Sequence, residues 1–259
     1  MAHILRDCHF TFRCRDCLSK LPYATFVATI LCIVGLGVFG GTFYRASTLT
    51  NLIFIEIFHL QVQWVRIVQM TLVILAGVMA LVSLVMVSLG WLATGSTRHK
   101  VYRRWKARAN GKVSSAVFIG ISYVFFYVWT AVLVATTAAS VIYSFLWGLC
   151  TSKQKHLERD CIDFTQFDWL FPNGTRIEDM QVCGAEELKL FCKDYVEIAQ
   201  ASFIISTAAA FVVALSLVHY LMCLTSNYAY IRDHEKIADL HEHYLEHERM
   251  TRGDKSRFS

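Results

Sequence analysis

Seven of the nine cysteines fall into two groups, and a cysteine thiol can form a disulfide, bind a metal or carry a lipid. One group precedes the first long apolar run of the chain, and the other lies between the third and fourth runs. The two groups are Cys8, Cys14 and Cys17, and Cys150, Cys161, Cys183 and Cys192. The redox compartment of each group decides among these chemistries, and the compartment depends on the membrane topology of the chain.

Four apolar runs are long enough to cross a bilayer. The chain is 55% hydrophobic and only 17% charged, and an apolar run of about 18 residues or more is typical of a transmembrane helix. The first run exceeds the apolar core of a signal peptide, so we interpret it as a retained anchor. The sequence therefore predicts an all-α membrane protein, a four-transmembrane-helix bundle with spans at 21–41, 68–93, 117–149 and 198–225.

Basic residues are concentrated in segment 94–116, which has no acidic residue. Its seven basic residues are Arg98, Lys100, Arg103, Arg104, Lys106, Arg108 and Lys112. The N-terminal segment 1–20 has four more, whereas segment 42–67 has two. Because cytosolic loops collect Lys and Arg, we expect 94–116 and both termini, 1–20 and 226–259, to be cytosolic. Segments 42–67 and 150–197 are then extracellular, and the seven basic side chains are expected to contact anionic lipids.

This topology predicts disulfides among the four cysteines of the second extracellular loop. An even set of cysteines in an oxidising compartment is typical of a disulfide framework. Three pairings are open, and a nested one would tie the end of the third span to the start of the fourth through Cys150 and Cys192. The same loop contains the sequon Asn-Gly-Thr, which predicts glycosylation of Asn173.

The N-terminal cysteines are expected in the reducing cytosol. Cys8, Cys14 and Cys17 lie close to basic residues and to a membrane span, and we predict that they are palmitoylated. A zinc site with His3 or His9 is the alternative, but it lacks a second paired motif.

The residue pattern does not favour an enzyme or a transporter. The predicted spans contain no Asp, Glu, Lys or Arg, which disfavours a transporter. His219 lies within the fourth span, where we interpret it as an interfacial or packing residue. No nucleophile–base pair, phosphate loop or carboxylate pair stands out, so we predict no enzyme, no metal and no cofactor.

Helical patterns continue outside the spans. Residues 51–70 predict an amphipathic helix leading into the second span, either packed on the other extracellular loop or presented to a partner; Leu60 to Trp64 also alternates like a strand. The tail predicts a short helix with a frayed end, in which His243 and His247 have metal-ligand spacing but a solvated charged face is preferred. Small residues at four-residue spacing predict helix packing. They are Gly37 and Gly41; Ala131, Ala135 and Ala139; and Ser206, Ala210 and Ala214.

Three stretches of the sequence resemble the myelin proteolipid protein family. They are "LPYATFVATILC" at Leu21–Cys32, "FPNGTRIEDMQVCGAEELKLFC" at Phe171–Cys192 and "SNYAYIRD" at Ser226–Asp233. The last is similar to the neuronal membrane glycoprotein branch. The first extracellular loop has no cysteine, which departs from the family and indicates a divergent member of invertebrate type. The resemblance implies the nested pairs Cys150–Cys192 and Cys161–Cys183, palmitoylated N-terminal cysteines, plasma-membrane residence, and roles in cell contact, junctions and process outgrowth.

Together these features predict a non-enzymatic membrane glycoprotein that organises plasma-membrane contacts. We expect its partners to be membrane lipids and other membrane or junction proteins, reached through the extracellular loops, with homo-oligomerisation left open and no nucleic acid. A tetraspanin-like organiser is the alternative, although the Cys-Cys-Gly of that class is missing. A claudin is disfavoured because the first extracellular loop has no cysteine pair, and a channel or transporter is a weaker alternative.

Overall fold

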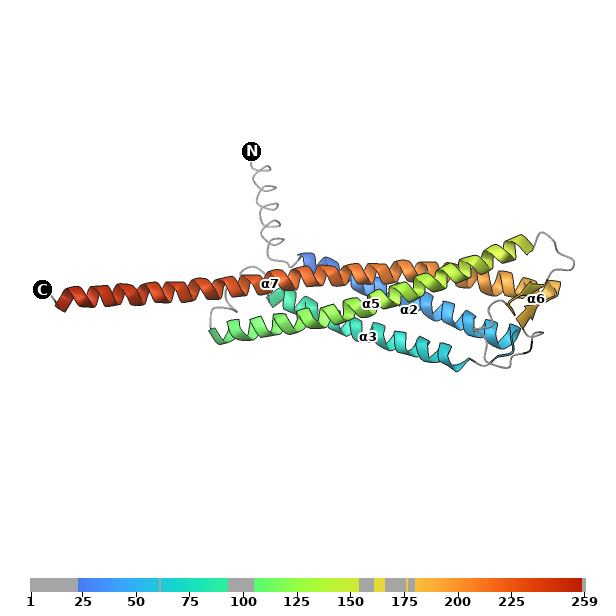
Figure 1. Ribbon diagram of the computed structural model, residues 1–259, viewed down its shortest axis with the longest axis horizontal. Helices are drawn as coiled ribbons and strands as arrows, with labels where there is room; N and C mark the ends of the chain where they lie inside the picture. Colours follow the sequence, from blue (N-terminus) through green and yellow to red (C-terminus); the bar gives the residue numbers. More distant parts are fainter. Residues whose placement is uncertain are drawn as a thin grey trace, which may run out of the picture. The chain divides into compact units, whose positions relative to one another are not determined.

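The computed structural model describes residues 23–60, 62–92, 105–153, 161–165, 176 and 180–257, with backbone alone for 89–92, 105–112, 153 and 251–257. Four of its helices are long and apolar enough to cross a membrane (Figure 1). The elements are α2 (Tyr23–Leu52), η1 (Ile53–Ile57), α3 (Gln63–Leu92), α5 (Trp105–Lys153), β1 (Ile162–Asp163), β2 (Gln181–Val182), α6 (Ala185–Lys189), η4 (Leu190–Val196) and α7 (Glu197–Arg257). The predicted fold class, an all-α membrane protein with a disulfide-bonded segment between its third and fourth helices, is confirmed.

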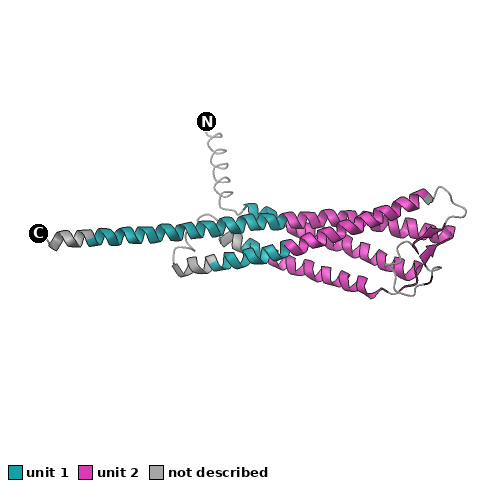
Figure 2. Ribbon diagram, in the orientation of Figure 1, with its two compact units in different colours: residues 1–29, 84–126, 216–259 teal, residues 30–83, 127–215 magenta. Residues whose placement is uncertain are grey.

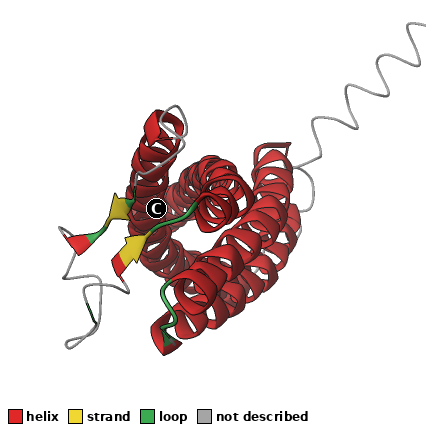
Figure 3. Ribbon diagram, turned by 90° about the vertical axis from the view of Figure 1, so that its right-hand side faces the viewer, coloured by secondary structure: helices red, strands yellow, loops and turns green. Residues whose placement is uncertain are grey.

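The chain divides into two compact units, to which all four long helices contribute (Figure 2). Unit 1 comprises Met1–Thr29, Leu84–Phe126 and Ser216–Ser259, and unit 2 comprises Ile30–Ser83 and Tyr127–Leu215. Figure 3 looks onto the end of unit 2, where the two short strands lie beside the helix ends.

Buried side chains recur every seven residues along three of the long helices. On α2 they are Thr25, Cys32, Phe39 and Ala46, and Ile53 of η1 continues the series; on α5 they are Ser115, Ser122, Trp129, Thr136, Tyr143 and Cys150; on α7 they are Phe203, Ala210, Leu217, Leu224 and Ile231, preceded by Val196 of η4. A seven-residue repeat keeps one stripe of each helix toward its neighbours and is typical of left-handed coiled-coil packing. The remaining faces expose large apolar side chains, which suits them to lipid.

Of the three predicted small-residue stripes, only that on α7 faces the core throughout. Ser206, Ala210 and Ala214 are buried, whereas Gly37, Gly41, Ala131 and Ala135 are exposed and Ala139 is half-buried. A close contact between α2 and α7 in unit 2 lies at Gly35 instead. A Cβ added to Gly35 would lie 2.9 Å from Cγ2 of Val213, so only glycine fits there without a shift.

The continuous amphipathic helix predicted over 51–70 is wrong. The chain widens into the π-helix η1, in which the Phe58 N–H donates to the Ile53 carbonyl at 3.3 Å, and His59 then adopts a left-handed φ of 50°. The extra residue in the turn shifts the helical phase, and the reversal at His59 ends the helix. Trp64 and Ile67, which a continuous amphipathic helix would place on its apolar face, are consequently 55% and 65% exposed.

The short tail helix is also wrong in length, because α7 continues to Arg257. Extending an existing helix requires no new nucleation, so a polar sequence that would be a poor helix alone can continue from the fourth span.

Candidate functional site: the disulfide-linked segment

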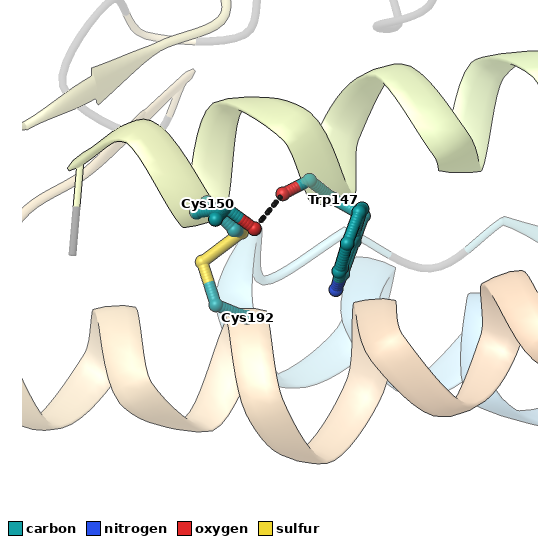
Figure 4. Close-up of a disulfide and its surroundings, with 4 residues drawn as sticks. Trp147, Cys150 and Cys192 are labelled. Carbon is teal, nitrogen blue, oxygen red and sulfur yellow. Dashed lines mark hydrogen bonds between the residues drawn. A yellow bond between two sulfur atoms is a disulfide. The ribbon is translucent and has the colours of Figure 1, made fainter.

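Two nested disulfides crosslink residues 150–197, which we call the disulfide-linked segment. It runs from the last turn of α5 through η4 to the first residue of α7. The longer bridge, Cys150–Cys192, joins the last turns of α5 to η4 with a Cα–Cα distance of 5.6 Å. Figure 4 shows this bridge crossing between the two helices, with Trp147 one turn earlier on α5. The shorter bridge is Cys161–Cys183, with a Cα–Cα distance of 4.4 Å. This is the nested pairing that the sequence resemblance implies.

The shorter bridge closes a very small antiparallel ladder. Ile162 pairs with Val182 and Asp163 with Gln181, so Cys161 and Cys183 directly precede and follow the paired residues. Two pairs of strand residues are too few to be stable alone in water. The covalent bond therefore contributes much of what holds these strands together.

Four phenylalanine rings form a cluster that includes Phe164, the residue directly after β1. Phe58, Phe164 and Phe191 are all buried, with ring centroids 5.5 to 6.4 Å apart in edge-to-face geometry, and Phe54 lies 6.1 Å from Phe58. Edge-to-face pairs add stability beyond burial of apolar area. Because Phe54 and Phe58 come from the α2–α3 connection, this cluster joins two segments that are distant in the sequence.

A hydrogen bond reinforces the same junction. The Tyr195 hydroxyl on η4 donates to a carboxylate oxygen of Glu56 on η1. Of the two interpretations of residues 51–70, packing against the cysteine-rich segment is therefore confirmed. The π-helical turn of η1 orients Glu56 and Phe58 toward the disulfide-linked segment, where they contact Tyr195 and Phe164.

Interhelical hydrogen bonds continue this junction into the bundle of unit 2. The Tyr143 and Thr50 hydroxyls are 2.7 Å apart, those of Ser140 and Thr207 are 2.9 Å apart, and Gln200 Nε2 donates to the Ser144 hydroxyl at 3.4 Å. Polar contacts within an apolar bundle fix the register of its helices, since a shifted register would leave these groups unsatisfied.

One carboxylate of the segment has a shifted titration. The Thr165 backbone N–H donates to Asp163 Oδ1 at 2.9 Å and lowers the pKa of that carboxyl below its ordinary value. The segment thus carries a charge that the fold stabilises in its ionised form.

The myelin proteolipid protein family profile, described as PLP or lipophilin, matches residues 11–236 of the chain. The chain belongs to the myelin proteolipid protein family. Neuronal membrane glycoprotein M6-a of Mus musculus is 27% identical over 232 residues, which cover 85% of this chain and 82% of that protein. Neuronal membrane glycoprotein M6-b of Mus musculus is 25% identical, with 86% and 71% covered. Proteolipid protein DM beta of Squalus acanthias is 28% identical, with 85% and 82% covered. No solved structure matches the chain.

Sequence reasoning included this junction as one of two interpretations of 51–70, but it missed the phenylalanine residues that form it. Phe58, Phe164 and Phe191 lie in three segments far apart in the chain, and no local periodicity links them. Composition gave no signal either, because 51–70 has three aromatic residues in twenty, close to the 14% of the whole chain.

Several other predicted sites lie outside the described residues, namely Cys8, Cys14, Cys17, Asn173, Arg98, Lys100, Arg103 and Arg104. Lys106, Arg108 and Lys112 lie on α5, but the structure describes only their backbone. Within the described part of the chain, no three His, Cys, Asp or Glu side chains are placed to hold a metal ion. His219, His243 and His247 are exposed on α7.

Proposed function

We propose that this proteolipid family protein is a non-enzymatic organiser of plasma-membrane contacts, and that its disulfide-linked segment is the contact element. The observation that carries the proposal is the junction of that segment with η1. Two disulfides, the phenylalanine cluster and the Tyr195–Glu56 hydrogen bond link the described residues of the two connections to one another. A preformed surface loses little conformational entropy on binding, which favours recognition between membranes.

The proposal requires these linked residues to face the cell exterior. Its support is the excess of Lys and Arg in 94–116 and the persistence of disulfides in oxidising compartments. Epitope tags at both termini should stain only after permeabilisation, and Asn173→Gln should abolish an endoglycosidase-sensitive mass shift. Staining of either tag on intact cells would reject the topology.

Two cytosolic lipid contacts accompany this topology. We place palmitoyl chains on Cys8, Cys14 and Cys17, and anionic lipids against the seven basic residues of 94–116, each worth about 1 kcal/mol near a charged surface. Changing the three cysteines to serine should remove most of the thioester-linked acyl label. Undiminished label in that variant would reassign the lipid to another cysteine, such as Cys223. A peptide of 94–116 should prefer anionic over neutral vesicles, and equal binding to both would reject the lipid contact.

Contact formation itself can be tested by mixing two populations of cells that express the protein with different fluorescent tags. We expect enrichment where two expressing cells meet and none where an expressing cell meets a control cell. The variant Cys161→Ser with Cys183→Ser should lose this enrichment at equal surface level, whereas Cys223→Ser should keep it. Full enrichment with the shorter bridge absent would exclude the disulfide-linked segment as the contact element.

A further inference from the structure

The C-terminal part of α7, residues 232–257, is a long helix with an exposed apolar stripe, and we call it the tail helix. Ile237, Leu240 and Tyr244 are 63%, 73% and 69% exposed. Between 232 and 250 every residue is exposed except Glu235 and Ala238, which are half-buried. Since helices in proteins draw most of their stability from packing an apolar face, this stripe indicates a surface that is covered by a partner.

The surface of the tail helix has the shape that a coiled-coil partner needs. A shallow hollow is lined by Ile237, Leu240, His241, His243, Tyr244 and His247. These six residues make two overlapping sets with the spacing i, i+3, i+4 and i+7. One set begins at Ile237 and the other at Leu240. In a coiled coil, four residues with this spacing form the hole that receives one side chain of the facing helix.

We propose that residues 237–247 of the tail helix form a short parallel, two-stranded coiled coil with the same residues of a second copy of this chain. In this register Ile237 and Tyr244 occupy a positions, and Leu240 and His247 occupy d positions. Leu240 of the second copy enters the hole that begins at Ile237, and Tyr244 enters the hole that begins at Leu240. A β-branched residue at a with leucine at d favours two strands.

A second copy fits this surface better than a bilayer does. The fourth span and the tail are one uninterrupted helix, so two copies inserted in the same membrane direct their tails the same way, as a parallel pair requires. The tail helix has seven acidic and six basic residues. This near balance gives little repulsion between identical tails, and the small acidic excess disfavours an anionic lipid surface. The proposal goes beyond contact formation and does not rest on it.

The test compares two leucines of the tail helix in the full-length protein reconstituted into liposomes. Leu240→Glu places a charge in the seam, whereas Leu245→Glu makes the same change at a b position, on a leucine that is 40% exposed. Fluorescence energy transfer between C-terminally labelled copies, diluted with lipid, measures association. We expect Leu240→Glu to weaken association about tenfold or more, equivalent to about 1.4 kcal/mol or more, and Leu245→Glu to leave it within about twofold.

Cysteine crosslinking gives a second readout that does not depend on tail stability. Leu240→Cys should form a bridge between residues 240 of two copies, identified by peptide mapping, and Leu245→Cys should not. Energy transfer that survives Leu240→Glu, or equal crosslinking at both positions, would overturn the proposal. Loss of contact enrichment in mixed cells would leave these results unchanged, so the two proposals fail separately.

Discussion

The segment before α7 and the C-terminal part of α7 keep their structure by different means. Before its N-terminal end, the described residues 161–165 and 180–196 contain two short strands and two short helical elements, and two disulfides, buried rings and a tyrosine–carboxylate hydrogen bond hold them. At its C-terminal end, residues 232–257 form continuous helix with an exposed surface. In this protein, a segment with little regular secondary structure can therefore be held by tertiary contacts, and a long regular helix can be exposed.

The two segments differ because disulfides are available to one of them and helix propagation from a membrane span is available to the other. Cysteines crosslink where the compartment is oxidising, so a segment with little hydrogen-bonded structure can still have one conformation. A polar segment without crosslinks can continue a helix that the membrane has already nucleated. The first kind of segment suits a fixed recognition surface, and the second suits association that depends on concentration.

Removing the longer bridge should have the largest effect. The chain-entropy model assigns Cys150–Cys192 about 4 kcal/mol, because it closes the larger loop. We expect Cys150→Ser with Cys192→Ser to lower the stability of the purified protein in detergent by about this amount, measured by denaturant unfolding. Cys223→Ser is the control, since that thiol is unbridged in the structure. An unchanged unfolding midpoint in the double variant would show that this disulfide does not stabilise the fold.

Truncating one ring of the phenylalanine cluster should rank second. Phe58→Ala removes a buried ring that contacts Phe164 and Phe191, which costs about 3 kcal/mol for a large-to-small change in a core. Phe145→Ala is the matched control because that ring is exposed on α5. The same denaturant midpoint measures both. A loss no larger for Phe58 than for Phe145 would show that the cluster does not stabilise the junction.

A helix-weakening change should distinguish the two ends of α7. Glycine lowers helix stability by about 1 kcal/mol relative to alanine. Ala238→Gly should increase amide hydrogen exchange in the tail helix and leave the global unfolding midpoint unchanged. Ala199→Gly, at a fully buried position, should lower the global midpoint. A global effect of Ala238→Gly would mean that the tail helix is coupled to the bundle.

The smallest expected effect is a pH dependence of the disulfide-linked segment. The pKa of Asp163 is lowered in the folded chain, so its stabilisation is present above its unfolded pKa and is lost as the pH falls through the lowered value. Amide exchange of residues 161–165 should therefore rise on acidification below the usual carboxylate range. Asp163→Asn should remove that dependence, and an identical pH profile in the variant would assign it to other groups.

Sequence reasoning identified four helices that are apolar enough to cross a membrane, but it missed which of their faces pack together. Hydropathy identifies a span because all of its faces are apolar. For the same reason, hydropathy does not indicate which face packs against the other helices. Gly37 and Gly41 looked like a packing stripe and are exposed, whereas Gly35, two residues before Gly37, lies against Val213. A visible signal was the seven-residue spacing of Ser115 and Ser122, since small polar residues favour the interior of a membrane bundle.

The geometry of the connections depended on information that local sequence does not hold. The π-helical turn at η1 and the left-handed His59 break a helix whose apolar spacing looked continuous. The ring contacts join residues more than a hundred positions apart, such as Phe58 and Phe164. Residue spacing left three disulfide pairings open, and the family resemblance chose the pairing found in the structure.

The two disulfides differ in how a dissolved thiolate can reach them. Cys161 and Cys183 are exposed, whereas Cys150 and Cys192 are buried. Thiol–disulfide exchange requires the attacking sulfur to approach the bond, so a mild reductant cleaves the shorter bridge first. Stepwise reduction and alkylation then passes through a form in which the strand ladder is released while α5 and η4 stay covalently tied.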